Sequence, residues 1–429
     1  MTCASDIVPT NLKRASILTL PNEVLLRIFY EVYYASCDIR LDEESTTKLA
    51  DASLFPQCLI KVCKAWKKLV RSVPRFATRI MVFVDEPISF DELRGRFEDS
   101  KTLFIKVFAI RRQYPDTYDP FEKGVTRDVV KALSPHIERC KVVVFDLLQN
   151  SSLPHMTQFS GQAPKLRTLR MQCRRSVANE STQLVSQHEL LTQPSPFICP
   201  HLQYLDMHGH MFVEAVHIPQ WQRSIRALSR KQLTISHLRN VPAEEFDLRK
   251  LMLTLSEIHH LTKLKLLDVE LDNTTCISEA SPGPIFIQNF EFEDLSRSFF
   301  TGFFAAYENA IDVSDTVIKN CQLGRVDYFP SWSLKFENID AEEDLVEFIS
   351  RWDGFYLLFK NCPGIDDRLL ERLSTLPPPG KVFYAPTFRH LEISGSSSAS
   401  NFSVEALKFL VTARKEHADS DCLSSPMKT

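Results

Sequence analysis

The stretch Leu202-Gln203-Tyr204-Leu205-Asp206-Met207 carries the pattern from which the fold of this chain follows. Its large apolar residues stand at the first, fourth and sixth positions. Apolar side chains that recur at every second position indicate a short β-strand with one buried face. The same spacing returns in order along the chain at residues 166–171, 264–269 and 388–393. A single copy could arise by chance on any amphipathic strand, whereas four ordered copies indicate a structural repeat.

The phrase L-x-x-L-x-L resembles the strand core of a leucine-rich repeat. The resemblance implies that each repeat adds one parallel strand to a shared core and that a return segment closes the coil. Distances between copies are uneven, and the Asn/Cys position of the family is mostly degenerate. We therefore expect an α/β fold in residues 80–413, an irregular leucine-rich-repeat-like solenoid of parallel strands and return helices. An α/β domain with a conventional parallel sheet is the competing architecture. Weaker copies of the phrase stand at residues 233–241, 285–290, 333–339 and 355–362.

Segments with helical periodicity separate the expected strands. We interpret them as return helices of the solenoid rather than as partner-binding helices. The expected helices are residues 89–100, 126–139, 246–259, 341–351, 366–376 and 402–413. Before the first clear copy of the phrase, strands are expected at residues 80–84, 103–110 and 141–148.

Residues 17–79 have a different pattern, which opens with Leu20-Pro21-Asn22-Glu23. Pro21 suits a first helical turn because its φ is already helical. Glu23 lies in the same turn, where the helix dipole favours a carboxylate. The apolar stripe of this first helix consists of Val24, Leu25, Ile28, Phe29 and Val32.

A second helix is expected to begin at Pro56. Between the two helices, residues 36–53 are polar and acidic, and we expect them to form an inserted loop. The apolar face of the second helix consists of Leu59, Val62, Cys63, Trp66, Leu69 and Val70.

These two helices together resemble an F-box, in the form that fungi carry in large numbers. The sequence phrases on which this resemblance rests are Leu-Pro-x-Glu-Val-Leu-Leu-x-x-Ile-Phe and Val-Cys-x-x-Trp-x-x-Leu-Val, the second of which is followed by a proline. The resemblance implies a small helical hairpin that docks on the Skp adaptor of a cullin–RING ubiquitin ligase. The loop at residues 36–53 makes the separation of the two phrases longer than in the family pattern. Matched to the motif, the partner-binding residues are Leu20, Pro21, Glu23, Val24, Leu25, Ile28, Phe29, Val62, Cys63, Trp66 and Leu69. Those expected to be exposed for adaptor contact are Leu20, Pro21, Glu23, Ile28 and Val62, whereas Trp66 is expected to lie mainly in the core.

The composition is that of a globular protein, with 44% hydrophobic and 24% charged residues among 429. A net charge of −3 argues against nucleic acid as the main partner, because phosphate binding depends on clusters of Lys and Arg. Eleven cysteines without a C-x-x-C pair indicate reduced thiols and a cytoplasmic or nuclear location. We expect no signal peptide and no membrane span. Residues 1–16 and 414–429 are expected to be disordered.

The sequence lacks the short motifs that mark several common kinds of catalytic site. The nucleophile elbow G-x-S-x-G, the phosphate loops G-x-x-x-x-G-K-[ST] and G-x-G-x-x-G, and the zinc motif H-E-x-x-H are absent. His201, His208 and His210 are close in sequence to Cys199. Metal ligation there would need a fourth ligand in register and an ordered loop, and we interpret the histidines as surface or capping residues. We therefore expect no catalytic residue, no metal site and no cofactor.

The function implied by the resemblance is that of a substrate-recognition subunit of a Skp–cullin–F-box type ubiquitin ligase. The hairpin would bind the Skp adaptor, and through it cullin, while the repeat region would recruit an unknown target protein. Such a subunit is not itself an enzyme and acts by raising the effective concentration of the target. One alternative is a non-catalytic interaction scaffold whose F-box-like hairpin only caps the repeat domain. A hydrolase or transferase with an unrecognised site is a second alternative, which the missing motifs weaken.

Overall fold

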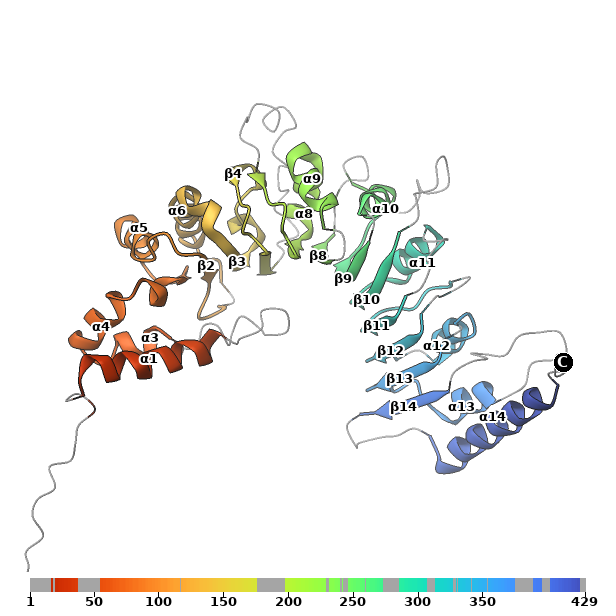
Figure 1. The fold of residues 1–429 in the computed structure, drawn as a ribbon. Coiled ribbons are helices and arrows are strands. Elements are labelled where there is room, and N and C mark those ends of the chain that lie inside the picture. The colour runs from red at the N-terminus through yellow and green to blue at the C-terminus, as the bar shows by residue number, and fades with distance from the viewer. Residues whose placement is uncertain are drawn as a thin grey trace, which may run out of the picture.

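The chain forms a curved arc in a computed structural model, with a helical hairpin at one tip (Figure 1). The residues expected to be disordered at 1–16, residues 38–53 of the loop expected at 36–53, and residues 425–429 lie outside the described part of the chain. The expected loop bound is wrong at its start, because residues 36 and 37 still belong to helix α1 (Asn22–Cys37). The structure describes residues 17, 20–37, 55–115, 117–175, 197–228, 231–239, 241, 246–258, 260–272, 285–306, 313–326, 329, 331–340, 342–352, 354–374, 389–395 and 402–424.

The fold is α/β and is built on one twelve-stranded parallel sheet. The strands of this sheet lie in chain order, so that each pairs with its neighbours within the same sheet. A separate two-stranded sheet consists of β4 (Gly161–Gln162) and β6 (Phe197–Ile198). The twelve strands are β1 (Arg79–Phe83), β2 (Ile105–Ile110), β3 (Cys140–Gln149), β5 (Thr168–Arg175), β7 (Tyr204–His208), β8 (Lys231–Leu238), β9 (Leu261–Val269), β10 (Ile287–Glu293), β11 (Asp315–Lys319), β12 (Ser333–Glu337), β13 (Tyr356–Lys360) and β14 (His390–Ser394).

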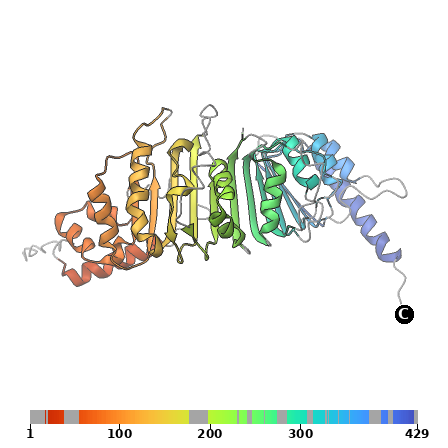
Figure 2. The ribbon, with the colours of Figure 1, turned by 90° about the horizontal axis from the view of Figure 1, so that it is seen from above.

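Strands line the inner side of the arc and helices lie on its outer side (Figure 1). Seen from above, the elements follow one another in chain order, so the arrangement is that of an α/β solenoid (Figure 2). The helices are α1 (Asn22–Cys37), α3 (Gln57–Ile60), α4 (Lys64–Arg71), α5 (Phe90–Asp99), α6 (Glu122–Leu133), α8 (Gly209–His217), α9 (Pro219–Arg226), α10 (Leu248–Glu257), α11 (Arg297–Ala306), α12 (Glu342–Ile349), α13 (Asp367–Ser374) and α14 (Val404–Ser424). Short 3-10 helices are η2 (Pro74–Ala77), η3 (Ser134–Arg139), η4 (Asn150–Ser152) and η5 (Met156–Gln158).

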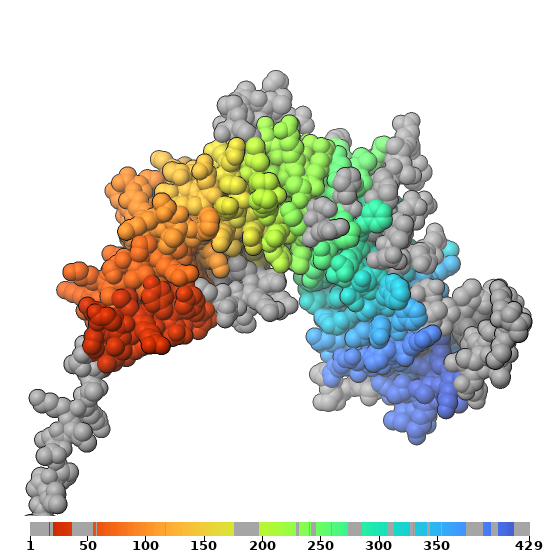
Figure 3. Space-filling view, viewed as in Figure 1, coloured from red at the N-terminus to blue at the C-terminus, as the bar shows by residue number. Residues whose placement is uncertain are grey.

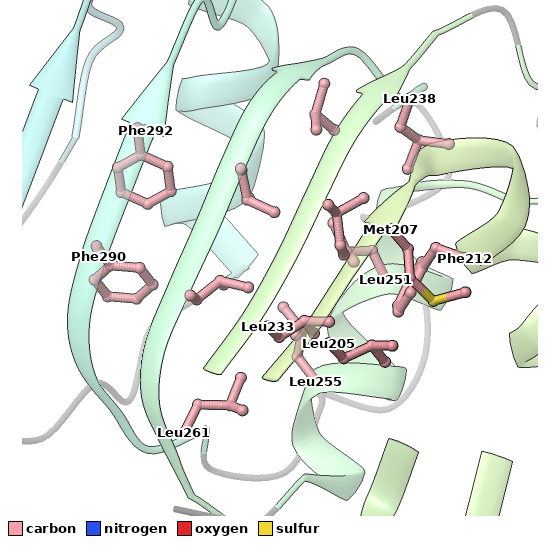
Figure 4. Packing of buried hydrophobic residues seen from close by; sticks show 14 of the residues in the cluster. Leu205, Met207, Phe212, Leu233, Leu238, Leu251, Leu255, Leu261, Phe290 and Phe292 are labelled. Atoms are coloured by element: carbon pink, nitrogen blue, oxygen red, sulfur yellow. The ribbon is translucent and has the colours of Figure 1, made fainter. Parts of the chain in front are cut away.

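Alternation along each strand builds the core between the sheet and the helices. In β7, Leu205 and Met207 are fully buried, while Asp206 lies on the opposite, concave face. Leu233 of β8 stands beside Leu205 in register, and Figure 4 shows these leucines packed with Leu251 of α10. Burying a side chain of this size contributes roughly 1.5–3 kcal/mol. The apolar phrase of β7 therefore supplies one layer of the core.

A left-handed residue recurs at one register position of successive strands. Six of the seven non-glycine residues with positive φ in the described chain immediately follow strand positions that are aligned by pairing. Five of these six are Asn or Asp, the residue types that tolerate this conformation best after glycine. The backbone N–H of Asn338 donates to Lys360 O in the next strand, at 3.0 Å, and Asn320 makes the equivalent bond to Glu337 O. We call this set the left-handed ladder: His237, Asp268, Asp294, Asn320, Asn338 and Asn361.

Several features of the solenoid differ from the sequence prediction, among them the following. Strand β11 and helix α11 were not expected; α11 is so rich in phenylalanine that its apolar run shows little helical periodicity. The helix expected at residues 126–139 becomes η3 from Ser134, because Pro135 removes a backbone donor. The expectation of disorder is wrong for residues 414–424, which continue α14. There Arg414 Nη2 donates to Leu373 O at 2.8 Å and ties α14 to the end of α13.

Candidate partner-binding site

The hairpin at the N-terminal tip has a core of its own, separate from the core of the solenoid. The ring of Phe29 in α1 packs edge-on against Trp66 in α4, with centroids 4.8 Å apart. No acceptor in the described part of the chain lies within hydrogen-bond distance of Trp66 Nε1. The buried residues of the hairpin are Leu25, Phe29, Phe55, Leu59, Trp66, Val70 and Phe76. The prediction that Trp66 lies in the core is thus confirmed.

The second helix of the hairpin is broken, and the prediction of one helix from Pro56 to Val70 is wrong. It ends at Ile60 and resumes at Lys64. Cys63 adopts an extended conformation before α4, and its Sγ accepts a bond from Trp66 N at 3.5 Å. This cap starts a new helix, as small polar caps do elsewhere. Val62 consequently leaves the apolar face and is 51% exposed.

The apolar stripe expected on α1 divides between the core and the solvent. Leu25 and Phe29 are buried, whereas Val24 is 43% exposed and Ile28 is 37% exposed. Val24 and Ile28 are one helical turn apart and therefore lie on the same side of α1. Val24, Ile28 and Val62 are thus the exposed branched apolar residues among those matched to the motif. The other motif-matched residues are exposed at Pro21 and Glu23 and half-buried at Leu20, Cys63 and Leu69.

Hydrogen bonds fix the hairpin to the first coil of the solenoid. The hydroxyls of Tyr33 and Thr78 lie 3.2 Å apart. Arg79, the first residue of β1, donates from Nη1 to Ser36 O at 3.1 Å. Because Lys106 N of β2 donates to Thr78 O at 2.8 Å, the junction also reaches the second strand. The hairpin therefore ends the sheet on the β1 side (Figure 3).

The concave face of the solenoid carries charges that neutralise one another. Glu293, Lys319, Glu337 and Lys360 stand side by side in register on four neighbouring strands. Lys319 Nζ lies 3.2 Å from Glu293 Oε1, and Lys360 Nζ lies 3.7 Å from Glu337 Oε1. Burial opposes the charge of Lys265, but its bonds to two glutamates outweigh this and raise its pKa. Paired charges of both signs give this face no strong field of one sign.

Aromatic side chains lie at the amino ends of the last three strands. Trp332 is 56% exposed and Tyr356 is 53% exposed. The rings of Trp332 and Phe355 have centroids 5.2 Å apart, and those of Tyr356 and His390 are 5.6 Å apart. The guanidinium of Arg389 lies over the Phe355 ring at 5.5 Å. We call these five residues the aromatic edge. None of the sequence motifs indicated a binding role for these residues, although an aromatic residue stands directly before or at the start of these strands.

Three histidines gather at the carboxyl ends of β7 and β8. The ring centroids of His208 lie 5.5 Å from His210 and 5.8 Å from His237. His208 is fully buried, and burial followed by the two neighbouring imidazoles lowers its pKa to about 3. Cys199 and His201 precede β7 and so lie at its other end. Within the described residues, no group of His, Cys, Asp or Glu could hold a metal ion.

Comparison with models of known families and with curated proteins yields no match for this chain. Seven cysteines whose side chains the structure describes are free thiols: Cys58, Cys63, Cys140, Cys173, Cys199, Cys321 and Cys362. None of the described helices combines the length and apolar character needed to cross a membrane.

Proposed function

We propose that the chain is a substrate receptor of a Skp–cullin–F-box type ubiquitin ligase, with an F-box-like hairpin and a leucine-rich-repeat-like solenoid. The observation that carries the proposal is the exposure of Val24 and Ile28 on a helix whose remaining motif-matched apolar residues are buried or half-buried. In this reading the hairpin binds the Skp adaptor and the solenoid recruits a target protein. The subunit supplies proximity and holds no catalytic residue of its own.

Exposed apolar side chains on the hairpin support an adaptor-binding role. Single exposed apolar residues are common on protein surfaces, but branched side chains on one face of a helix suit a partner's apolar groove. Val24 and Ile28 share a helix face, and Val62 is exposed in the turn before α4. Buried neighbours such as Phe29 and Trp66 would hold this surface rigid, so that little order would be lost on binding.

The aromatic edge supports the recruitment of a target. Trp, Tyr and Arg are the residue types that most often dominate the energy of protein interfaces. Trp332, Tyr356 and Arg389 place all three types on neighbouring strands of the solenoid. By contrast, the ion pairs of the central concave face would have to be broken by a partner of either charge. We therefore assign target contact to the aromatic edge.

A capture experiment with the purified chain and the Skp-type adaptor from the same organism tests the proposal. The variant Val24→Glu with Ile28→Glu introduces charge where the adaptor would bind. The matched control is Val404→Glu with Val411→Glu, since both residues are 60% exposed on α14 at the far tip of the arc. We expect capture of the wild type and of the control, and loss of capture in the α1 variant. No capture of folded wild-type chain at micromolar concentration would refute the adaptor-binding role.

An interaction scaffold remains the second candidate, and one observation favours it. The bonds of Tyr33 to Thr78 and of Arg79 to Ser36 are those expected of a hairpin that caps the first strand. A cap alone requires these bonds but not the exposed Val24 and Ile28. If the folded chain binds no adaptor, and Val24→Glu with Ile28→Glu leaves its stability unchanged, the scaffold is the better account.

A further inference from the structure

A cavity of about 200 Å³ lies between the hairpin and the first coil of the solenoid. Its walls come from α3, α4 and η2 on one side and from β1 and α5 on the other. Pockets for drug-sized ligands begin at about 300 Å³, so this cavity takes a smaller group. Neither Val24 nor Ile28 lines it, and the inference that follows does not depend on adaptor binding.

Charged side chains around the cavity leave an excess of positive charge. Two more basic than acidic residues line it. Lys67 and Arg71 are one helical turn apart on α4, an arrangement in which like charges repel. In the described part of the chain neither of them forms an ion pair. The charged lining residues are Lys67, Arg71, Arg79, Arg96, Glu92 and Asp99.

Glu92, a carboxylate that lines the cavity with these two cations, already has another partner. Glu92 Oε1 accepts from Arg96 Nη2 at 2.8 Å, and Arg96 Nη1 donates to Met81 O at 2.8 Å. The bond from Arg96, followed by the fields of Arg71 and Lys67, lowers the pKa of Glu92. The cations of α4 thus lower the pKa of Glu92, but the side chain that pairs with it is Arg96 of its own helix α5. An anion from outside the chain would complete the pairing of Lys67 and Arg71.

The remaining wall of the cavity is apolar. Val70 and Phe76 contribute from the hairpin core, and Ile80 and Met81 contribute from β1. All four side chains are less than a tenth exposed, so the wall is well packed. A ligand that fits must therefore combine one small anionic group with a small apolar group.

We propose that this cavity binds a carboxylate carried on a small apolar group. The carboxylate lies between Lys67 and Arg71, where the guanidinium can donate two parallel bonds, and the apolar group lies against Val70 and Phe76. Two sources have this chemistry: the C-terminal residue of a polypeptide and a free carboxylic acid.

Calorimetric titration of the full chain with three probes tests the proposal. N-acetyl-leucine represents a polypeptide C-terminus, isocaproate represents a free acid, and N-acetyl-leucinamide is the neutral control. We expect both acids to bind at millimolar concentration and the amide not to bind. Tighter binding of N-acetyl-leucine than of isocaproate identifies a polypeptide C-terminus as the ligand, whereas equal binding identifies a free acid.

The matched variants differ only in which side of α4 they change. Lys67→Ala with Arg71→Ala removes the two lining cations, and we expect it to weaken N-acetyl-leucine about tenfold or more. Lys64→Ala with Lys68→Ala removes an equivalent exposed pair that does not line the cavity, and we expect little change. Binding of the amide as tight as that of the acid, failure of both acids to bind, or equal losses in the two variants would overturn the proposal.

Discussion

The indole ring of Trp66 meets the ring of Phe29 edge-on at a centroid distance of 4.8 Å, and this contact joins α4 to α1. Around it, Phe55 and Phe76 pack with centroids 4.9 Å apart. These rings make up much of the small hairpin core, which is separate from the solenoid core. The orientation of the exposed Val24 and Ile28 therefore depends on a handful of aromatic contacts.

The substitution Trp66→Ala is expected to lower the free energy of unfolding of the hairpin by about 3–5 kcal/mol, because it removes a large buried ring. Urea unfolding followed by circular dichroism measures the loss. Val24→Ala is the control: Val24 is 43% exposed, so its substitution should leave the unfolding midpoint nearly unchanged. Equal effects of the two substitutions would contradict the division of α1 into buried and exposed apolar residues.

The left-handed ladder is expected to be sensitive to side-chain type at Asn338. This residue has φ of 54°, and its Nδ2 donates to Asn320 Oδ1 at 2.9 Å. Asn338→Ala should cost about 1–2 kcal/mol, because an alanine resists the left-handed conformation. Asn338→Gly should cost less, since glycine adopts it freely. Unfolding midpoints of the two variants give the order, and an alanine variant at least as stable as the glycine variant would refute the assignment. Asp340→Ala, at an exposed position nearby, serves as the control.

The buried His208 is expected to make the fold less stable in acid. Its pKa is lowered to about 3 by burial and by two neighbouring imidazoles, against an ordinary value of 6.5. Below pH 6.5 the unfolded chain binds a proton that folded His208 does not take up, so stability falls as pH falls. For one such proton the slope is about 1.4 kcal/mol per pH unit.

His208→Phe keeps a ring of similar shape and removes the titration, so its stability should fall less steeply between pH 6.5 and the ordinary carboxylate range. His155 contributes in the opposite direction, because its bond to Glu214 raises its pKa and its stabilisation is lost as pH rises. The difference between wild type and His208→Phe removes that common contribution. Parallel pH profiles for the two proteins would show that His208 is protonated in the fold.

Trp332 is expected to account for most of the tryptophan fluorescence that iodide can quench. It is 56% exposed, whereas Trp66, Trp221 and Trp352 are 7%, 1% and 1% exposed. Trp332→Phe should therefore leave a blue-shifted spectrum that iodide barely affects, without a change in the unfolding midpoint. Quenching that persists in this variant would show that another indole is accessible. If the aromatic edge contacts the target, a bound target should protect Trp332 from iodide.

The L-x-x-L-x-L phrase predicted the buried residues of β5 and β7 correctly, because their apolar positions are large and evenly spaced. In β9 the structure buries Leu266 instead of Leu267, and in β14 it leaves Leu391 and Ile393 half-buried. Leu205 and Met207 behave as expected, and Asp206 between them lies on the concave face. β11 was missed because its five residues, Asp315–Lys319, contain no leucine and bury only Thr316 and Ile318. In the sequence, the left-handed ladder appears only as an Asn or Asp two residues after a buried apolar residue of a strand. In the leucine-rich-repeat pattern, the corresponding Asn or Cys stands three residues after the last leucine of the phrase.

The hairpin surface could be predicted only in part, because exposure depends on tertiary contacts. The apolar pattern on α1 gave one broad stripe, whereas packing buries Leu25 and Phe29. The motif match predicted correctly that Ile28 and Val62 are exposed, but it did not predict the exposure of Val24. The position of Val62 depends on the cap formed by Cys63, which periodicity does not reveal. The cavity beside Lys67 lies between segments that only the fold brings together.

Because each strand of the large sheet pairs only with its neighbours in chain order, the number of coils sets the length of the arc. The span between the hairpin and Trp332 is set by the number of coils between them and by the small rotation that each adds. Removal of one complete coil would shorten the reach between the two tips while the remaining coils kept contacts of the same kind. The gain or loss of single coils during evolution can therefore change the distance between a partner bound at one tip of the arc and a partner bound at the other.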